Sequence, residues 1–139
     1  MKKKLLSVLL CAAMALSMTA CGQGKANEEN DGEGTSPLVG DSSEEYYMIS
    51  FLSGIDYWKT CYTGMEDAAK LYGVSAQYTG QTDSDVAGQV SVLEQVIAKQ
   101  PKGIAISCVN STALADTINS AIDQGIQVVT FDSDSPTSN

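Results

Sequence analysis

The fold is decided by the stretch YYMISFLSGIDYW, residues 46–58. Its first half, 46–52, is apolar and rich in aromatic and β-branched residues, which favours a β-strand. The run stops at a Ser-Gly pair, and the only tryptophan of the chain, Trp58, then follows Tyr57. From Trp58 onward apolar residues recur at steps of three and four, the period of an α-helix, and Tyr57 lies off this stripe. The stretch therefore predicts a strand, a short loop and a helix that begins near the two aromatic residues.

The same alternation continues to the end of the chain. Four apolar runs predict strands at 46–52, 74–79, 103–108 and 126–131. Three patterns of helical period separate them, running from Trp58 to Tyr72, from Val86 to Ile97 and from Leu114 to Ile122. Helix ends are expected before Gly73, Pro101 and Gly125. The expected N-terminal caps are Asp83 or Ser84 for the second helix and Ser111 or Thr112 for the third.

Alternating strands and helices are typical of an α/β domain with a parallel sheet. The runs 104–106 and 128–131 are almost continuously apolar, as expected for strands that are covered on both faces. Right-handed crossovers leave few topologies, and we predict a doubly wound, Rossmann-like sheet with strand order 2-1-3-4. In such sheets ligands bind outside the carboxyl ends of the strands, where the strand order reverses.

Three loops are predicted to meet at that edge, at 53–57, 108–112 and 132–136. The candidate ligand contacts in or beside them are Asp56, Tyr57, Trp58, Asn110, Asp132 and Asp134. The first loop holds one glycine, whereas a dinucleotide fingerprint needs three, so it is not a phosphate cradle. Aromatic rings with carboxylates suit a neutral polyhydroxylated molecule. Its C–H face packs on a ring, and its hydroxyls donate to the carboxylates.

Most of these candidates also have a purely structural interpretation. Trp58 continues the helical stripe and could simply close the core. Asp132 could satisfy loop amides as an Asx turn, and Asn110 could close the turn before a helix. Asp56 and Asp134 suit turn or helix-cap roles equally well. The sequence leaves these alternatives open.

The N-terminus has the features of an export signal. Residues 1–4 are basic, and the uncharged run 5–20 is close to a secretory h-region but shorter than the roughly 20 residues that cross a bilayer. The placement of Cys21 resembles the bacterial lipobox, in which the cysteine becomes the lipidated first residue; a plain secreted protein or an uncleaved anchor is the alternative. We expect a lipoprotein signal peptide at 1–20, an acylated cysteine with a flexible acidic tether at 21–45, and a folded domain at 46–139.

Composition excludes several classes of function. The chain has 17 acidic residues against 8 basic ones, for a net charge of −9, and no arginine, so it is not expected to bind nucleic acid. Histidine, the usual general base and metal ligand, is absent. We therefore predict no metal, no cofactor and no enzymatic activity. Cys61 and Cys108 would form either a disulfide or, as we expect, two small buried apolar side chains.

Three segments carry a family resemblance: YTGQTDSDVAGQVSVLEQVI (78–97), GIAISCVNSTAL (103–114) and VVTFDSDSP (128–136). They resemble the first lobe of type I periplasmic binding proteins, the sugar receptors of ABC importers, and most of all the ribose, rhamnose and quorum-signal sugar group. The resemblance covers residues 46–139. It implies that Asp132 binds sugar hydroxyls and that Tyr57 and Trp58 stack on the sugar.

The sequence departs from the ribose-type pattern at two positions. Ser133 stands where those receptors have arginine, and Ile55 stands where they often have asparagine, which disfavours ribose itself. The resemblance implies a lipid-anchored, extracytoplasmic protein that binds a monosaccharide or polyol and delivers it to an ABC permease. A sugar-sensing lipoprotein that reports to a membrane kinase or chemoreceptor is the alternative. The second lobe and the hinge strands of the family have no counterpart in these residues, so we expect a partial N-terminal lobe.

Overall fold

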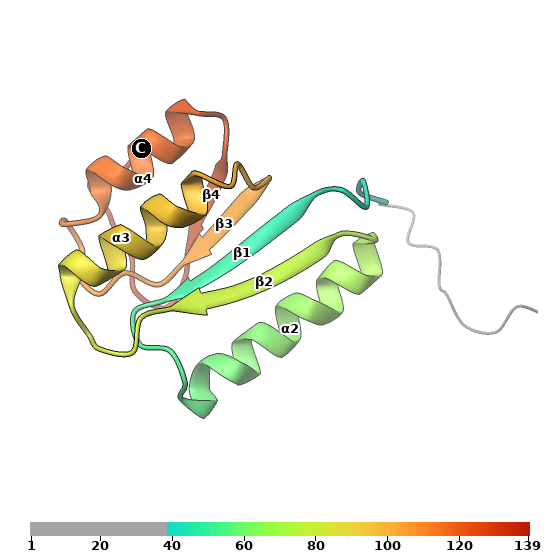
Figure 1. Ribbon diagram of the computed structural model, residues 1–139, viewed down its shortest axis with the longest axis horizontal. Helices are drawn as coiled ribbons and strands as arrows, with labels where there is room; N and C mark the ends of the chain where they lie inside the picture. The colour runs from blue at the N-terminus through green and yellow to red at the C-terminus, as the bar shows by residue number, and fades with distance from the viewer. Residues whose placement is uncertain (1–38) are drawn as a thin grey trace, which may run out of the picture. The chain divides into compact units, whose positions relative to one another are not determined.

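The computed structural model describes residues 39–139. In this range the elements follow the order β1, α2, β2, α3, β3, α4, β4 (Figure 1). The strands are β1 (Glu45–Ser50), β2 (Ser75–Gly80), β3 (Gly103–Ile106) and β4 (Gln127–Thr130), and the helices are α2 (Asp56–Tyr72), α3 (Val86–Ile97) and α4 (Ala115–Asp123). The predicted alternation of strand and helix is confirmed.

The predicted signal peptide, the lipidation site Cys21 and most of the predicted tether lie outside the described residues. The last residues of the predicted tether are described and are part of the fold, because β1 already begins at Glu45. The backbone N–H of Gly40 donates to the carbonyl of Tyr72 at 2.7 Å, and Glu44 pairs with Lys102 at 3.5 Å. The last residues of the segment predicted as tether are thus bonded to the folded domain.

The four strands form one parallel sheet with the order β2-β1-β3-β4, as predicted. Across its middle, Met48 lies opposite Ala105, and Ala105 lies opposite Val129. The predicted strands 103–108 and 126–131 were too long at their carboxyl ends. The ladder stops at Ile106 and Thr130, because the chain bends there into the loops that form the edge of the sheet.

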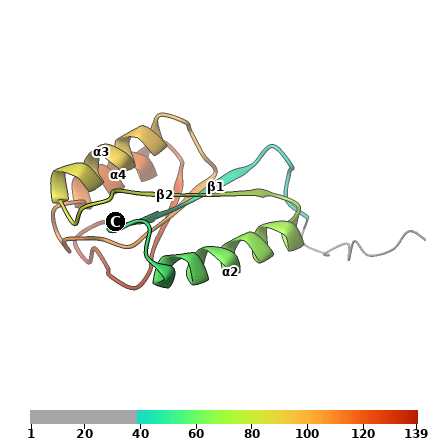
Figure 2. The same cartoon turned by 60° about the horizontal axis from the view of Figure 1, so that its bottom comes forward.

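Helices α3 and α4 cover one face of the sheet, and α2 covers the other (Figures 1 and 2). We call the α3–α4 side the closed face. Its core contains the fully buried side chains of Leu93, Ile106, Leu114 and Ile118. Each such side chain contributes about 1.5–3 kcal/mol through the apolar area that it removes from water. This face therefore contains the main apolar core of the domain.

Within residues 39–139, the opposite face of the sheet is covered over only two of its four strands. Helix α2 packs on β1 and β2. Beside it, Ala105, Val129 and Phe131 line an apolar groove of about 360 Å³, and we call these three residues the open strip. Val129 is 60% exposed although it lies in a run that predicted burial on both faces. The apolar run therefore predicted the strand correctly but not the cover on both of its sides.

The helix ends confirm one predicted cap and correct another. Helix α2 ends at Gly73 in the left-handed conformation, with φ 73°, as its sequence predicted. Helix α3 is capped by Asp85, whose carboxylate accepts the N–H of Gly88 at 2.7 Å. The prediction of Asp83 or Ser84 was wrong, because Asp83 already belongs to the preceding turn, where its carbonyl accepts the N–H of Asp85 at 2.8 Å.

The two cysteines of the domain are free thiols. Cys108 is buried in the core, and burial raises its pKa to about 11. Cys61 is exposed, so the prediction that both would be buried was wrong for this residue. The reason is the open strip, because Cys61 lies on the flank of α2 that borders the groove.

Candidate functional site

Tyr57 and Asp132 meet at the carboxyl edge of the sheet. The Tyr57 hydroxyl, at the start of α2, donates to Oδ1 of Asp132, just after β4, at 2.8 Å. The expectation that these two residues share one edge is confirmed. The carboxylate accepts this hydrogen bond and thereby raises the pKa of Tyr57. Its negative charge raises the pKa further, because it disfavours the phenolate. Tyr57 is 56% exposed, so the pair faces outward.

Asp132 occupies a strained backbone position. Its φ is +60°, in the left-handed region that few residues other than glycine adopt. The N–H of Ser133 donates to the carbonyl of Phe131 at 2.6 Å, so Asp132 is the central residue of a three-residue turn. Such conformations cost on the order of 1–3 kcal/mol and are frequent where a protein must aim a functional group.

Ser107 holds the second carboxylate oxygen. It lies one residue beyond β3, is fully buried, and donates from Oγ to Oδ2 of Asp132 at 3.0 Å. A carboxylate can accept about four hydrogen bonds, so roughly two acceptor positions of the exposed Asp132 are left for a ligand. Sequence reasoning missed Ser107 because it counted the residue as part of a strand. Its signal was a hydroxyl at the end of an apolar run.

Trp58 lies behind the exposed pair instead of beside it. Its side chain is 1% exposed and makes edge-to-face contacts with three rings. The ring centroids lie 4.6 Å from Tyr57, 5.3 Å from Phe51 and 5.8 Å from Phe131. This placement agrees with the alternative that Trp58 closes the core. Its buried indole N–H has no acceptor among the described residues, and such a donor costs about 1–3 kcal/mol when it is left unpaired.

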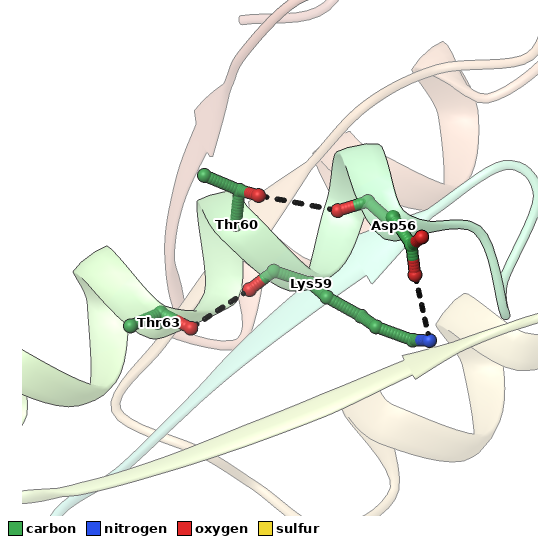
Figure 3. Close-up of polar contacts among 4 residues, drawn as sticks. All are labelled: Asp56, Lys59, Thr60 and Thr63. Carbon is green, nitrogen blue, oxygen red and sulfur yellow. Dashed lines mark hydrogen bonds and ion pairs between the residues drawn. The ribbon is translucent and has the colours of Figure 1, made fainter.

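Asp56 belongs to the first turn of α2 and points along the helix. The ammonium of Lys59 lies 2.9 Å from its carboxylate. Figure 3 shows this ion pair on the surface of the helix. The same view shows the hydroxyl of Thr60 donating to the carbonyl of Asp56, and that of Thr63 to the carbonyl of Lys59. Lys59 lowers the pKa of Asp56 by hydrogen bond and by charge. The Asp56 carboxylate is thus engaged by Lys59 on the helix surface.

Asp134 shapes the loop that follows β4. Its Oδ1 accepts the Thr130 hydroxyl at 2.6 Å and the N–H of Ser135 at 2.7 Å. These two hydrogen bonds lower the pKa of Asp134. The position corresponds to the turn role that the sequence had left open, and a ligand contact of this residue stays a prediction.

Asn110 organises the turn before α4. Its Oδ1 accepts the N–H groups of Thr112 and Ala113, each at 3.0 Å. The predicted cap at Ser111 or Thr112 was therefore wrong: the structural N-cap is Leu114, without a side-chain hydrogen bond, and Asn110 supplies the acceptor one turn earlier. A contact from Asn110 to a ligand is likewise untested.

The assembled edge offers acceptors and an aromatic ring, which can bind hydroxyl groups. In residues 39–139 there is no group of three or more metal-ligating side chains of the kind that would hold an ion. None of α2, α3 and α4, the helices of this described part, combines the length and apolarity of a membrane span.

A family model described as a periplasmic binding protein domain matches residues 46–139. The chain belongs to this family. The parallel sheet of this periplasmic binding protein domain, with its order β2-β1-β3-β4, has the arrangement of the solved relatives. Its homologues are sugar-binding periplasmic proteins of ABC transporters.

Three relatives show the range of similarity. AraP, an arabinose-binding protein from Geobacillus stearothermophilus, is 56% identical with a TM-score of 0.68, over 69% of this chain and 33% of AraP. A sugar-binding protein of a sugar ABC transporter from Bacillus halodurans is 52% identical with a TM-score of 0.68, over 69% and 33%. The multiple sugar-binding periplasmic receptor ChvE of Rhizobium radiobacter is 34% identical over 61 residues, 44% of this chain and 16% of ChvE. The periplasmic binding protein domain thus spans only about a third of the length of these solved relatives.

Proposed function

We propose that this chain provides one lobe of an extracytoplasmic solute-binding protein that binds a monosaccharide or related polyol for an ABC permease. The observation that carries this proposal is the Tyr57–Asp132 pair, 2.8 Å apart at the carboxyl edge of the sheet. A strained turn aims the carboxylate, and two of its acceptor positions are open. These features suit sugar hydroxyls, which need directed acceptors.

The sugar class that we favour is an aldopentose of the arabinose type. AraP, which is 56% identical, is an arabinose-binding protein. Ser133 in place of the arginine of ribose-type receptors argues against ribose. In this proposal Tyr57 and Asp132 contact the sugar, Trp58 supports the ring of Tyr57 from behind, and Asp56, Asn110 and Asp134 shape the rim around them.

The strength of binding to one lobe can be estimated. One ring contributes about 0.5–1.5 kcal/mol, and each hydrogen bond to a charged acceptor about 1.5–3 kcal/mol. One ring and two such bonds add up to about 3.5–7.5 kcal/mol, which falls short of the roughly 8 kcal/mol of micromolar binding, so this lobe alone should bind a pentose more weakly than that.

An NMR titration of the full chain tests this proposal. Arabinose, xylose, ribose and arabitol are added, and we expect saturable shifts at Tyr57 and Asp132 with the arabinose-type sugars. Asp132→Asn should abolish them, whereas Asp67→Asn, which changes an exposed carboxylate farther along α2, should not. If no sugar or polyol moves the signals of this edge, the proposal is wrong.

The membrane anchor is a separate part of the proposal. Cys21 would carry the lipid that holds the domain at the outer side of the cell membrane, after removal of residues 1–20. A labelled fatty acid should be incorporated into the chain in cells that process lipoproteins, and Cys21→Ala should release it from the membrane fraction. Incorporation into Cys21→Ala would place the lipid elsewhere.

Transport and sensing are distinguished in cells. Loss of the gene should abolish uptake of labelled sugar if the protein serves a permease. Unchanged uptake, with loss of a sugar-induced transcriptional response, would instead establish the alternative that the protein reports to a membrane kinase or chemoreceptor.

A further inference from the structure

Gln89 is a polar side chain in the middle of the closed-face core. It is 0% exposed and lies on the buried side of α3, one turn before Leu93. Its Nε2 donates to the carbonyl of Ser107 at 2.7 Å, and its Oε1 accepts the N–H of Val109 at 2.8 Å. The amide of Gln89 thus pairs with two backbone groups of the same loop.

That loop is where the chain leaves the sheet. Beyond Ile106 the ladder between β3 and β4 has ended, so the backbone groups of residues 107–109 need other partners. Gln89 supplies two of them from the side of α3. The third partner is the carbonyl of Ser133, which accepts the N–H of Cys108 at 3.0 Å. The loop after β3 is therefore held between α3 and the loop of Asp132.

The same loop reaches the Asp132 carboxylate. Ser107 turns its carbonyl to Gln89 and its hydroxyl to Oδ2 of Asp132, at 3.0 Å. A continuous series of hydrogen bonds thus joins Gln89 to Ser107, to Asp132 and to Tyr57. We propose that Gln89 is a positioning residue that, through Ser107, holds the Asp132 carboxylate in its ligand-binding orientation.

The role of Gln89 in sugar binding rests on the function proposed above. The effect of Gln89 on the Asp132 carboxylate, however, can be measured without a sugar. The reporter is Tyr57, whose pKa is raised by the hydrogen bond and the charge of Asp132. If Gln89 no longer holds Ser107, the carboxylate is less well placed, and the pKa of Tyr57 should fall toward its ordinary value.

The sugar-free experiment follows the alkaline titration of Tyr57 by NMR of chains with labelled tyrosine rings. Asp132→Asn is the reference, because removal of the carboxylate charge should lower the pKa of Tyr57. Gln89→Leu should lower this pKa as well. Gln95→Leu is the matched control, since Gln95 is exposed on the same helix and, among the described residues, its side chain bonds only to Ser91. Gln89→Glu, which keeps the size and one acceptor but loses the donor, should act in the same direction if Gln89→Leu does not fold.

The second experiment is a double-mutant cycle on sugar affinity. Gln89→Leu should weaken binding of an arabinose-type sugar roughly tenfold, about the effect of one lost hydrogen bond. In a Ser107→Ala background, which lacks the connecting hydroxyl, the same change should cost less than about twofold. A residue that only stabilises the fold would lower the melting temperature in both backgrounds and show no such coupling.

The outcomes separate the two proposals. A lowered melting temperature of Gln89→Leu with an unchanged pKa of Tyr57 would overturn the positioning role, and so would equal losses of affinity in both backgrounds. If the unaltered chain binds no sugar, the proposed function fails, while the tyrosine titration still decides the role of Gln89.

Discussion

The two faces of the sheet differ in how completely the described residues, 39–139, cover them. On the closed face, two helices bury a continuous core in which Leu93, Ile106, Leu114 and Ile118 are fully or almost fully buried. On the other face, α2 covers β1 and β2, and the open strip leaves Val129 60% exposed. The sheet has apolar side chains on both sides, so the difference lies in the cover and not in the strands.

This comparison separates the core that stabilises the domain from the edge that carries the candidate site. The core of the closed face contains Gln89, which hydrogen-bonds to Ser107, and Ser107 in turn donates to Asp132 of the candidate site. The face of α2 presents Tyr57 at the edge and leaves its far flank apolar and open. Changes to the closed face should therefore affect stability and site geometry together, whereas changes on the other face should separate them.

The largest expected effect tests the contrast directly. Leu93→Ala should lower the free energy of unfolding by about 2–5 kcal/mol, because it leaves a cavity in a closed core. Val129→Ala, on the open strip, should lower it by less than about 0.5 kcal/mol, because the side chain is already mostly in water. Urea denaturation measures both. Equal losses would mean that the open strip is as well covered in solution as the closed face.

The next effect concerns Cys108, in the core of the closed face. Burial raises the pKa of its thiol from 9.0 to about 11, so the folded state keeps the proton when the unfolded state has lost it. The resulting stabilisation is complete below about pH 9 and is lost as the pH rises through about 11, for a total on the order of 2–3 kcal/mol.

Denaturation at a series of pH values above about 8 measures this loss. In Cys108→Ala the decline of stability over that range should be flatter, since the tyrosines that also titrate there are common to both proteins. An identical decline in the two proteins would show that the closed face admits water to the thiol.

A smaller effect is expected at the start of α3. Asp85→Ala should cost about 1 kcal/mol of stability, because the N–H of Gly88 loses its acceptor. Asp83→Ala, two residues earlier, is the matched control and should change the free energy of unfolding by less than about 0.5 kcal/mol. Reversed results would restore Asp83 as the cap and place the helix start earlier than in the structure.

The smallest effect is expected for the exposed pair of Asp56 and Lys59 on α2. Their side chains are 95% and 62% exposed, so water and salt screen the attraction. The pKa of Asp56 is lowered in the folded state. The small stabilisation from the pair is therefore present at pH values above the unfolded pKa and is lost as the pH falls through the folded pKa. Lys59→Ala should lower the urea midpoint only slightly at neutral pH, and in about 1 M salt it should leave the midpoint unchanged. A salt-independent loss would point to packing by the lysine stem.

Local patterns in the sequence predicted most of the fold. Strands and helices each have their own hydrophobic period, and glycine at Gly73 marks a helix end through its backbone freedom. Parallel strands with right-handed crossovers then allow few strand orders, which is why the order 2-1-3-4 could be predicted. Strand ends were less well predicted, because apolar Cys108 and Phe131 follow the positions at which the ladder stops.

The candidate site was predictable at the level of loops but not of atoms. Tyr57 and Asp132 could be expected at one edge because all strands of a parallel sheet end on the same side. Gln89 gave a weak signal, as one polar residue in an apolar helical stripe, and nothing local showed that its partners lie in residues 107–109. Trp58 was ambiguous for the same reason, because Phe51 and Phe131, which bury it, come from other segments.

The sequence by itself determined the alternation of β and α, the parallel order of the strands and the loops that share an edge. These depend on periodicity and chain sterics, which act between residues that are near in the chain. The tertiary structure alone decided that Tyr57 hydrogen-bonds Asp132, that Trp58 turns inward and that half of one face stays open. Those outcomes depend on the direction of side chains and the reach of helices, which are set by neighbours far away in the sequence.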